Sequence, residues 1–276
     1  MQITIITVCH NSSKHLDKYI SSFLKHNKNL HSKINFIFVD NSDDKNSEQK
    51  VYRLKKNNFS IKFFKIKNNG FGNACNYAAT KTHSKYLIFC NPDVEFLSRL
   101  DFYFDTEFLW GTIKQLTKSN NVYSYDFYPE HRNIATELIR LNFLRSILYN
   151  FAPTIFYPVG SFLIVKNTVF KKINKFNESF FLYYEEIDLA RRLQSKYGNF
   201  SFIPDKSILH SGLGSFQNNN LAFKYETESF IKYAFLVNSK IVNKRLAVYR
   251  FLGIIYKSYF YRYKILKTFF EKYRNE

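Results

Sequence analysis

The sequence predicts an α/β protein with a mainly parallel sheet, helices on both of its faces and a basic helical extension at the C-terminal end. Short apolar runs alternate with segments of helical spacing through the first 90 residues, and this alternation is typical of parallel sheets. The length of 276 residues and the hydrophobic content of 45% suffice for one large domain with an appendage. We expect the α/β domain to span residues 1–215, in halves of about 1–95 and 96–215, and the extension to span 216–276.

The first 90 residues predict four strands separated by three helices. The strands are Ile3–Cys9, Ile34–Val39, Ile61–Ile66 and Tyr86–Cys90, and the helices are His15–Lys25, Asn46–Lys56 and Gly72–Thr80. The strand segments are rich in Ile, Val and Phe, which favour strands, and the first helix repeats apolar residues at three- and four-residue steps. Because ligands bind such sheets at the carboxyl ends of the strands, a site is expected in the residues that follow each strand.

The remaining residues have a less regular pattern. They predict helices at Glu107–Leu116, Ile134–Tyr149 and Tyr183–Ser195, and strands at Asn121–Phe127, Phe156–Val165, Phe200–Pro204 and Ser207–His210. From about Asn218 the pattern is helical to the last residue. An aromatic stripe at helical spacing runs through this part, at Tyr249, Leu252, Tyr256, Phe260 and Tyr263.

Charge and cysteine content narrow the class of protein. The 41 basic and 22 acidic side chains give a net charge of +19, of which residues 240–276 contribute +8; such a surplus favours a polyanionic partner. Three scattered cysteines predict neither a disulfide framework nor a zinc site, and favour a reducing cytosol. The first residues predict a strand rather than a signal peptide, and no run approaches the roughly 18 apolar residues of a membrane span. We expect a protein that is soluble or lies on a membrane surface.

Four polar segments stand where the predicted strands end. They are Thr7–Asn11, Val39–Ser42, Asn69–Asn76 and Asn91–Asp93. Asp40 is suited to accept hydrogen bonds from a ribose or a base, and the third segment turns into a helix whose N–H groups could face an anion. Asp93 stands where a carboxylate could hold Mg²⁺ or Mn²⁺ on a diphosphate. Neither the dinucleotide G-x-G-x-x-G motif nor the P-loop motif is present, which disfavours both of those classes.

An acidic cluster and one histidine complete the candidate site. Glu185, Glu186 and Asp188 open a predicted helix behind an aromatic run, and a partly buried carboxylate can act as a general base. Asp188 and Arg192 are four residues apart and can pair. His210 ends an apolar strand and precedes a small, flexible Ser-Gly segment, so it is a candidate ligand of a metal or a phosphate.

In this order the segments resemble the family 2 glycosyltransferases of GT-A fold. The similarity is strongest to bacterial rhamnosyltransferases and their relatives that build O-antigen and capsule. It covers about residues 1–215 and depends on the order of five segments, since no single motif is decisive.

The resemblance implies an inverting transfer from a nucleotide sugar to a hydroxyl of a surface glycan. Asp40 would contact the nucleoside, with Thr7 and Asn11 in the same pocket. Asp93 and His210 would hold Mg²⁺ or Mn²⁺. Glu186 falls on the family's base position, and Glu185 and Asp188 stand as the other candidates. The further nucleotide-sugar contacts would be Asn41, Asn69, Gly70, Gly72, Asn76, Asn91 and Arg192.

The partners follow from the same resemblance. The donor would be dTDP- or UDP-linked, with rhamnose as a candidate sugar, and the acceptor an O-antigen or capsule precursor, for which a lipid-diphosphate carrier is one candidate. We expect a cytoplasmic protein at the inner face of the cell membrane, held there by its basic extension. Packing of this extension on the sheet and a homodimer interface stay open as alternatives.

Two other functions are also compatible with the sequence. The +19 charge with interleaved Tyr and Phe would suit a non-catalytic protein that binds nucleic acid, although no nucleic-acid motif is present and no such partner is expected. A nucleotidyltransferase on a similar fold would also use Asp93 and a metal ion.

Overall fold

A computed structural model describes residues 3–102, 104, 107–119, 121–131, 142–212 and 219–237. The chain divides into two compact units, residues 1–217 and residues 218–276. The first unit holds the sheet and its helices. Of the predicted elements, residues 134–141 of one helix and the aromatic stripe from Tyr249 to Tyr263 lie outside the described residues.

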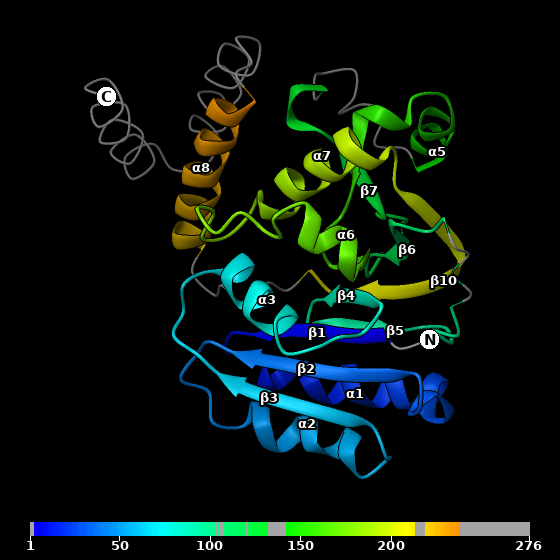
Figure 1. Ribbon diagram of the computed structural model, residues 1–276, viewed down its shortest axis with the longest axis vertical. Helices are drawn as coiled ribbons and strands as arrows, with labels where there is room; N and C mark the ends of the chain where they lie inside the picture. Colours follow the sequence, from blue (N-terminus) through cyan, green and yellow to red (C-terminus); the bar gives the residue numbers. More distant parts are fainter. Residues whose placement is uncertain are drawn as a thin grey trace. The chain divides into compact units, whose positions relative to one another are not determined.

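The N-terminal half forms the parallel part of the sheet (Figure 1). Its strands are β1 Ile3–Cys9, β2 Ile34–Asp40, β3 Ser60–Lys65 and β4 Tyr86–Cys90, and its helices are α1 Ser13–Asn27, η1 Lys28–Leu30, α2 Ser47–Lys55 and α3 Phe71–Ala79. The strands lie in the order β3-β2-β1-β4 and all three pairs are parallel. The predicted parallel sheet is therefore confirmed, and the carboxyl ends of these strands meet at one edge.

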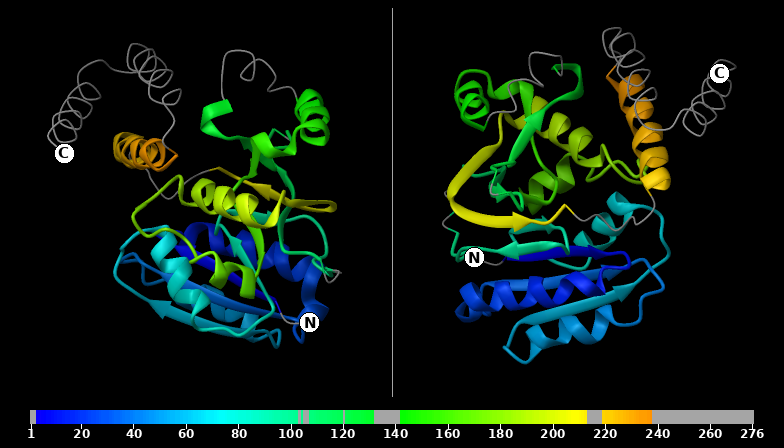
Figure 2. Two further views of the ribbon diagram at one scale, coloured as in Figure 1. Left: turned by 45° about the horizontal axis from the view of Figure 1, so that its top comes forward. Right: turned by 180° about the vertical axis from the view of Figure 1, so that it is seen from behind.

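The second half of the first unit extends this sheet with antiparallel and parallel strands. These elements are β5 Val94–Phe96, β6 Trp110–Leu116, β7 Tyr125–Phe127, η2 Pro129–His131, α5 Asn142–Phe151, η3 Pro153–Ile155, β8 Phe156–Pro158, β9 Phe162–Lys166, α6 Asn167–Lys172, α7 Glu185–Tyr197 and β10 Ser201–His210. The eight-stranded order is β3-β2-β1-β4-β9-β6-β10-β5, and β7 pairs with β8 in a second, two-stranded sheet. β9 is antiparallel to both of its neighbours, β4 and β6. Further views show the same layers of helices and sheet (Figure 2).

Aromatic side chains fill the core between α1 and the sheet. Phe23 of α1 makes edge-to-face contacts with Phe36 and Phe96, at centroid distances of 4.8 and 5.1 Å. Tyr19, one turn earlier, packs 5.0 Å from the Phe96 ring. Residues of β1 and β2 alternate between this core and the opposite face. This alternation decides which side chains at the strand ends reach the site.

One predicted element was wrong: residues Glu107–Leu116, expected as a helix, contain strand β6 (Trp110–Leu116). Trp, Thr and Ile favour strands over helices. Gly111 allows the close approach of β10, because a Cβ atom there would lie 2.1 Å from the Ser201 carbonyl oxygen. A glycine inside an apolar run thus marked a close strand contact rather than a helix.

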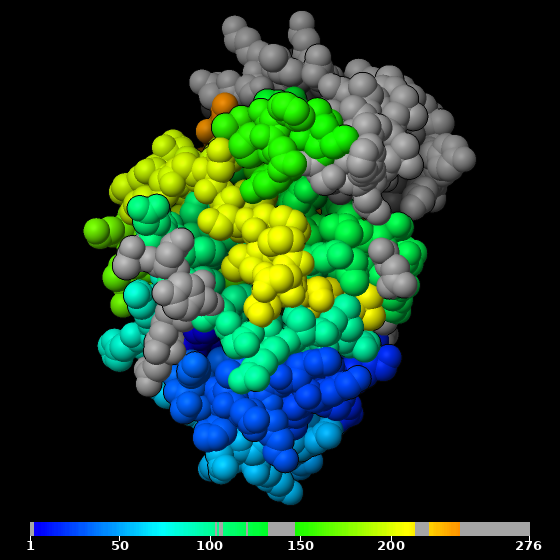
Figure 3. Space-filling model, turned by 90° about the vertical axis from the view of Figure 1, so that its right-hand side faces the viewer, coloured from blue at the N-terminus to red at the C-terminus, as the bar shows by residue number. Residues whose placement is uncertain are grey.

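Other boundaries also differ from the sequence pattern. The single strand expected over Phe156–Val165 is divided into β8 and β9 by residues 159–161, while the two strands expected between 200 and 210 form the continuous strand β10 with a register shift between Ile203 and Ser207. In the space-filling view β10 (yellow) crosses one face of the first unit (Figure 3). The short elements β5 and α6 had no clear pattern in the sequence.

The described part of the second unit is helix α8, Asn219–Leu236. Near its end Phe235 and Leu236 are exposed. Within the residues that the structure describes, no helix is both long and apolar enough to cross a membrane.

Candidate active site

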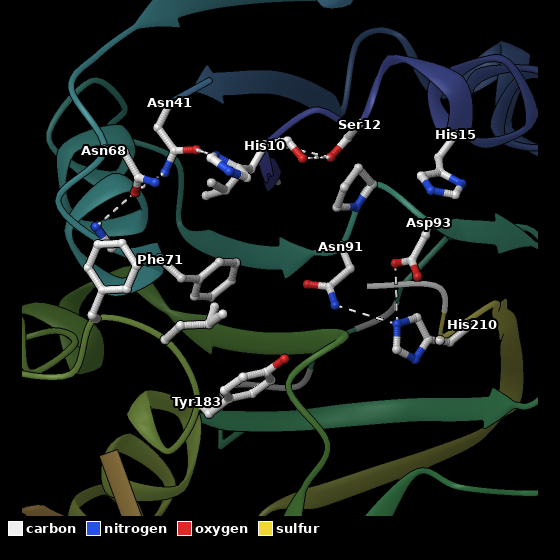
Figure 4. Close-up of a pocket in the computed structure, with 16 residues that line it drawn as sticks. His10, Ser12, His15, Asn41, Asn68, Phe71, Asn91, Asp93, Tyr183 and His210 are labelled. Carbon is white, nitrogen blue, oxygen red and sulfur yellow. Dashed lines mark hydrogen bonds and ion pairs between the residues drawn. The ribbon is translucent and has the colours of Figure 1, made fainter. Parts of the chain in front are cut away.

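A cavity of about 330 Å³ opens at the carboxyl ends of β1, β2 and β4. Its walls come from the segments that follow these strands, from the loop before α7 and from the end of β10 (Figure 4). The lining residues are Val8, His10, Ser12, His15, Asn41, Asn68, Gly70, Phe71, Asn91, Pro92, Asp93, Phe181, Leu182, Tyr183, His210 and Gly212. Five predicted residues meet here: Asn41, Gly70, Asn91, Asp93 and His210.

A chain of amide and imidazole groups forms one side of the cavity. His10 Nδ1 lies 3.0 Å from Asn41 Oδ1, and Asn41 Nδ2 donates to Asn68 Oδ1 at 3.1 Å. Asn68 Oδ1 also accepts the N–H of Gly70 at 3.2 Å. The loops after β1, β2 and β3 are therefore joined into one wall with hydrogen-bonding groups.

Gly70 is essential to the shape of this wall. Its φ of 101° lies in the left-handed region, and a Cβ atom there would lie 2.5 Å from the Phe181 carbonyl oxygen. That same oxygen accepts the N–H of Phe71 at 3.0 Å. The start of α3 and the loop before α7 therefore touch backbone to backbone, which requires glycine.

The other side of the cavity holds an acidic and a basic group in contact. His210 Nε2 lies 3.2 Å from Asp93 Oδ1, and Asn91 Nδ2 lies 3.5 Å from His210 Nε2. The antiparallel pairing of β10 with β5 places His210 opposite Val94, and the Ser211 N–H donates to the Asp93 carbonyl at 3.1 Å. Two segments far apart in the sequence are thus fixed side by side by backbone hydrogen bonds.

The environment keeps Asp93 ionised. Burial by itself would raise the pKa of the Asp93 carboxyl, but the hydrogen bond and charge of His210 outweigh it, and the pKa is lowered from its ordinary value. His15, on the cavity wall beside Asp93, adds a smaller effect in the same direction. A carboxylate at the cavity wall is therefore available at neutral pH.

The Asp93–His210 pair fits a divalent metal ion that is also held by a diphosphate. Among the described residues no group of three His, Cys, Asp or Glu side chains is clustered closely enough to hold a metal alone. Magnesium, however, is usually bound by one or two carboxylates together with substrate phosphates, and Asp93 supplies one carboxylate. Adjacent ligands in an octahedral shell with bonds of about 2.1 Å lie about 3.0 Å apart, close to the 3.2 Å between these two side chains.

Two residues expected in the nucleoside pocket lie beneath it. Thr7 is fully buried, and its hydroxyl lies 2.9 Å from the Tyr19 hydroxyl on the α1 side of the sheet. Asp40 is also fully buried: its Oδ1 accepts from the backbone N–H and the hydroxyl of Ser42 at 2.8 and 2.7 Å. Because strand residues alternate between faces, the neighbours Val8 and Asn41 line the cavity instead.

Four further predicted residues lie outside the cavity lining. Asn11 and Asn69 are exposed, Asn11 with a φ of 52°. Gly72 packs against Phe176, whose Cβ atom would lie 3.1 Å from a Cβ added at the glycine. Asn76 donates to the Phe176 carbonyl at 2.9 Å and to Glu178 at 2.8 Å, and accepts the Phe176 N–H at 3.0 Å. Asn76 therefore fastens the loop before α7 onto α3.

Asp188 and Arg192 perform a similar fastening. The Arg192 guanidinium donates to Asp188 Oδ2 at 2.7 and 2.9 Å, and to the carbonyls of Ile173 and Lys175. Asn174 and Lys175 both have left-handed φ values, 61° and 60°. The predicted ion pair exists, and it holds a strained turn rather than lining the cavity.

The two adjacent glutamates face different surroundings. Glu185 is 5% exposed, and its Oε2 atom has no hydrogen-bond partner among the described residues. Burial, and next the charge of Glu186, raise the pKa of Glu185 well above its ordinary value. Glu186 is half-buried and packs against Gly160, where an added Cβ atom would lie 2.9 Å from its Cγ atom. Neither glutamate lines the cavity.

Sequence reasoning did not predict most of the cavity lining, including the polar side chains of His10, Asn68, His15 and Tyr183. His10 and Asn68 stand one position from residues that the motifs indicated, so a pattern of strand ends alone could have suggested them. His15 is hidden within the apolar repeat of α1. Tyr183 precedes Tyr184, and both have left-handed φ values, 67° and 70°. Such strain in non-glycine residues is typical of functional sites, but a sequence does not reveal it.

The sequence profile of glycosyl transferase family 2 matches residues 4–173, more than half of the 276 residues. The chain belongs to this family. The segment that matches the family includes β1, β2 and β4, whose ends form the cavity of this glycosyltransferase. It therefore also includes the cavity residues Asn41, Asn91 and Asp93.

Individual relatives agree with this assignment. The chain is 23% identical over 198 residues to "Rhamnosyltransferase WbbL" of Escherichia coli K12, covering 64% of this chain and 73% of that protein. Residues 1–349 of TarS from S. aureus give a TM-score of 0.57 at 13% identity, covering 96% of this chain and 78% of that one. The mannosyltransferase PcManGT of Pyrobaculum calidifontis, in complex with GDP-Man and Mn²⁺, gives 0.54 at 11% identity, with 96% and 83% covered.

These likenesses confirm the GT-A fold. A longer TarS structure matches over only 43% of its length, so this chain spans less than half of that protein. Similar fold at such low identity does not carry over substrates or metals.

Proposed function

We propose that this glycosyltransferase moves a sugar, with inversion, from a nucleotide-diphosphate donor to a hydroxyl of a surface-glycan precursor. The observation that carries the proposal is the cavity itself. One wall offers the amide groups of Asn41 and Asn68, and the other offers Asp93 beside His210. The amide wall suits a nucleoside, and the wall with Asp93 and His210 suits a charged diphosphate.

The residues present define how the donor would be held. Amide side chains and the Gly70 turn bind and orient the nucleoside through hydrogen bonds. Asp93 and His210 would hold Mg²⁺ or Mn²⁺, and a bound divalent ion offsets negative charge on the departing diphosphate. The Mn²⁺ in the PcManGT complex supports this choice of metal.

Glu186 is the base that this arrangement favours. A base must be ionised, and burial, together with the charge of Glu186, raises the pKa of Glu185 and so disfavours its ionised form. Glu186 packs on Gly160, and the next residue, Ser161, accepts the N–H of Asn91 through its carbonyl at 3.0 Å. Its carboxylate would take the proton of the acceptor hydroxyl as that oxygen attacks the anomeric carbon. Such help contributes about 10²–10⁴ in rate.

The likeness to WbbL supports a rhamnosyl donor, and a TarS complex with UDP-GlcNAc supports a UDP-linked one. We propose dTDP-rhamnose as the first donor to test and UDP-GlcNAc as the second. Family membership favours sugar transfer over nucleotidyl transfer and over nucleic-acid binding.

The test is a donor assay with a matched pair of variants. Each donor is incubated with Mn²⁺ and an acceptor hydroxyl, and the released nucleotide is measured. Glu186→Gln should abolish turnover while the melting-temperature shift with nucleoside diphosphate persists, and Glu48→Gln, at an exposed site, should match wild type. Release of pyrophosphate would indicate a nucleotidyltransferase, and loss of both binding and turnover in Glu186→Gln would contradict the base role.

We also propose that the basic residues of 240–276 bind the anionic inner face of the cell membrane. Each Lys or Arg near such a surface adds about 1 kcal/mol, and this segment carries ten. Flotation of the protein with vesicles that contain anionic lipid tests the proposal. A protein truncated at Lys240 that floats equally well would contradict it.

A further inference from the structure

His15 is a histidine of the cavity wall with an unpartnered ring nitrogen. His15 lies in the first turn of α1 and lines the cavity. Its Nε2 atom is shielded from solvent and has no hydrogen-bond partner among the described residues. Burying a polar atom without a partner costs free energy, and such an atom at a cavity wall calls for an explanation by a ligand.

The position of His15 relates it to Asp93. Figure 4 shows His15 and His210 on opposite sides of the Asp93 carboxylate, and both interact electrostatically with it. The contact of α1 with β5, which begins next to Asp93, holds this arrangement. Lys118 is near enough to act electrostatically on His15. The surroundings of His15 therefore suit an anionic ligand that also touches Asp93 through a metal ion.

We propose that His15 is a binding residue for the diphosphate of the donor and donates a hydrogen bond from its imidazole to a diphosphate oxygen, on the side of Asp93 opposite to His210. This inference depends on the proposed use of a nucleotide-diphosphate donor. A diphosphate oxygen supplies the acceptor that Nε2 lacks. His15 also stands apart from the amide wall of Asn41 and Asn68, so its contact is with the phosphates rather than with the nucleoside.

The experiment compares nucleoside diphosphates with the matching monophosphates. Dissociation constants of UDP and UMP, and of dTDP and dTMP, are measured by calorimetry with Mn²⁺ for wild type, His15→Leu and His15→Gln. Exposed His83→Leu is the matched control. A lost hydrogen bond to a charged group weakens binding by about tenfold or more. We expect that loss for the diphosphate in His15→Leu, about unchanged monophosphate binding, and partial recovery in His15→Gln, which retains an N–H.

The melting temperature without nucleotide separates binding from structure. Because His15→Leu removes a buried polar atom that has no partner, it should melt at or above the wild-type temperature. Equal diphosphate affinity in wild type and His15→Leu would overturn the role of His15 and leave the proposed donor unaffected. Equal losses for diphosphate and monophosphate would overturn it too, since the side chain would then only shape the pocket. Wild-type protein that binds no nucleotide of either pair would contradict the proposed donor and His15 with it.

Discussion

The Nε2 atom of His210 lies 3.2 Å from the Oδ1 atom of Asp93, although the two residues are 117 positions apart in the chain. The backbone creates this contact, through the pairing of His210 with Val94 and the hydrogen bond from Ser211 to the Asp93 carbonyl. Backbone pairing therefore places the carboxylate and the imidazole next to each other. Preorganised charge of this kind is the largest single contribution in many enzymes.

Asp93→Asn should remove the metal-dependent part of donor binding. The amide cannot supply the negative charge that a divalent ion requires, so the extra melting-temperature shift that Mn²⁺ gives to nucleoside diphosphates should disappear. Turnover should fall by about 10²-fold or more, the scale of a lost electrostatic contact in the transition state. Addition of EDTA to wild type should produce the same loss. Asp205→Asn, at an exposed carboxylate on β10, is the control, and an unchanged Mn²⁺ effect in Asp93→Asn would exclude Asp93 as a ligand.

Glu185→Gln should stabilise the protein at neutral and alkaline pH. The folded-state pKa of Glu185 is raised, so the folded protein holds a proton that the unfolded chain releases above its ordinary pKa of about 4.3. Stability is therefore lost as pH rises from that value toward the folded pKa. Glutamine does not ionise, so the variant should melt above wild type at about pH 8, and the gap should narrow toward about pH 4. A gap that widens toward acid would contradict the raised pKa of Glu185.

The sequence predicted the parallel half of this fold well because local and global signals agree there. Each of the strands β1 to β4 is a short apolar run of β-favouring residues between helices, so composition and spacing indicate the same structure. β6 shows the opposite case. The role of Gly111 depends on its contact with Ser201 of β10, ninety residues later, which no local pattern contains.

The candidate site shows the same difference between residues that local patterns predict and residues whose role depends on distant contacts. Asp93 and His210 could be predicted because Asp93 follows an apolar strand and His210 ends one, and such strand ends lie at the ligand edge. Thr7 and Asp40 could be placed at strand ends, but which face they occupy depends on where α1 packs. Tyr19 contacts the Thr7 hydroxyl, and Ser42 donates to Oδ1 of Asp40. The motif residues Asn76 and Arg192 bind neighbouring backbone carbonyls, a use that motif order does not distinguish from ligand binding.

Arg192→Lys should lower stability and leave nucleotide affinity unchanged. The planar guanidinium reaches Asp188 and the carbonyls of Ile173 and Lys175 at once, and a single ammonium group cannot reproduce that fork. The loss of one or two such bonds costs about 1–3 kcal/mol of the free energy of unfolding. Urea unfolding measures this, with exposed Arg99→Lys as the control. A larger dissociation constant for UDP or dTDP, with an unchanged free energy of unfolding, would instead indicate that Arg192 contacts the ligand.

Gly70→Ala and Gly198→Ala form a pair that separates backbone strain from a steric clash. Both glycines have left-handed φ values, 101° and 80°, but a Cβ atom at Gly198 would meet nothing within 4 Å, whereas one at Gly70 would meet the Phe181 carbonyl oxygen at 2.5 Å. Gly198→Ala should therefore lower the free energy of unfolding by about 1 kcal/mol from strain.

Gly70→Ala should cost about 1–3 kcal/mol more, because the clash is with backbone that cannot rotate away. The displaced loop carries Tyr183, a residue of the cavity wall, so nucleotide affinity should fall in Gly70→Ala and stay unchanged in Gly198→Ala. Urea unfolding and calorimetry with UDP and dTDP give both quantities. Equal effects in the two variants would mean that the loop before α7 moves aside freely, and the contact of Gly70 with Phe181 would then not determine the shape of the cavity.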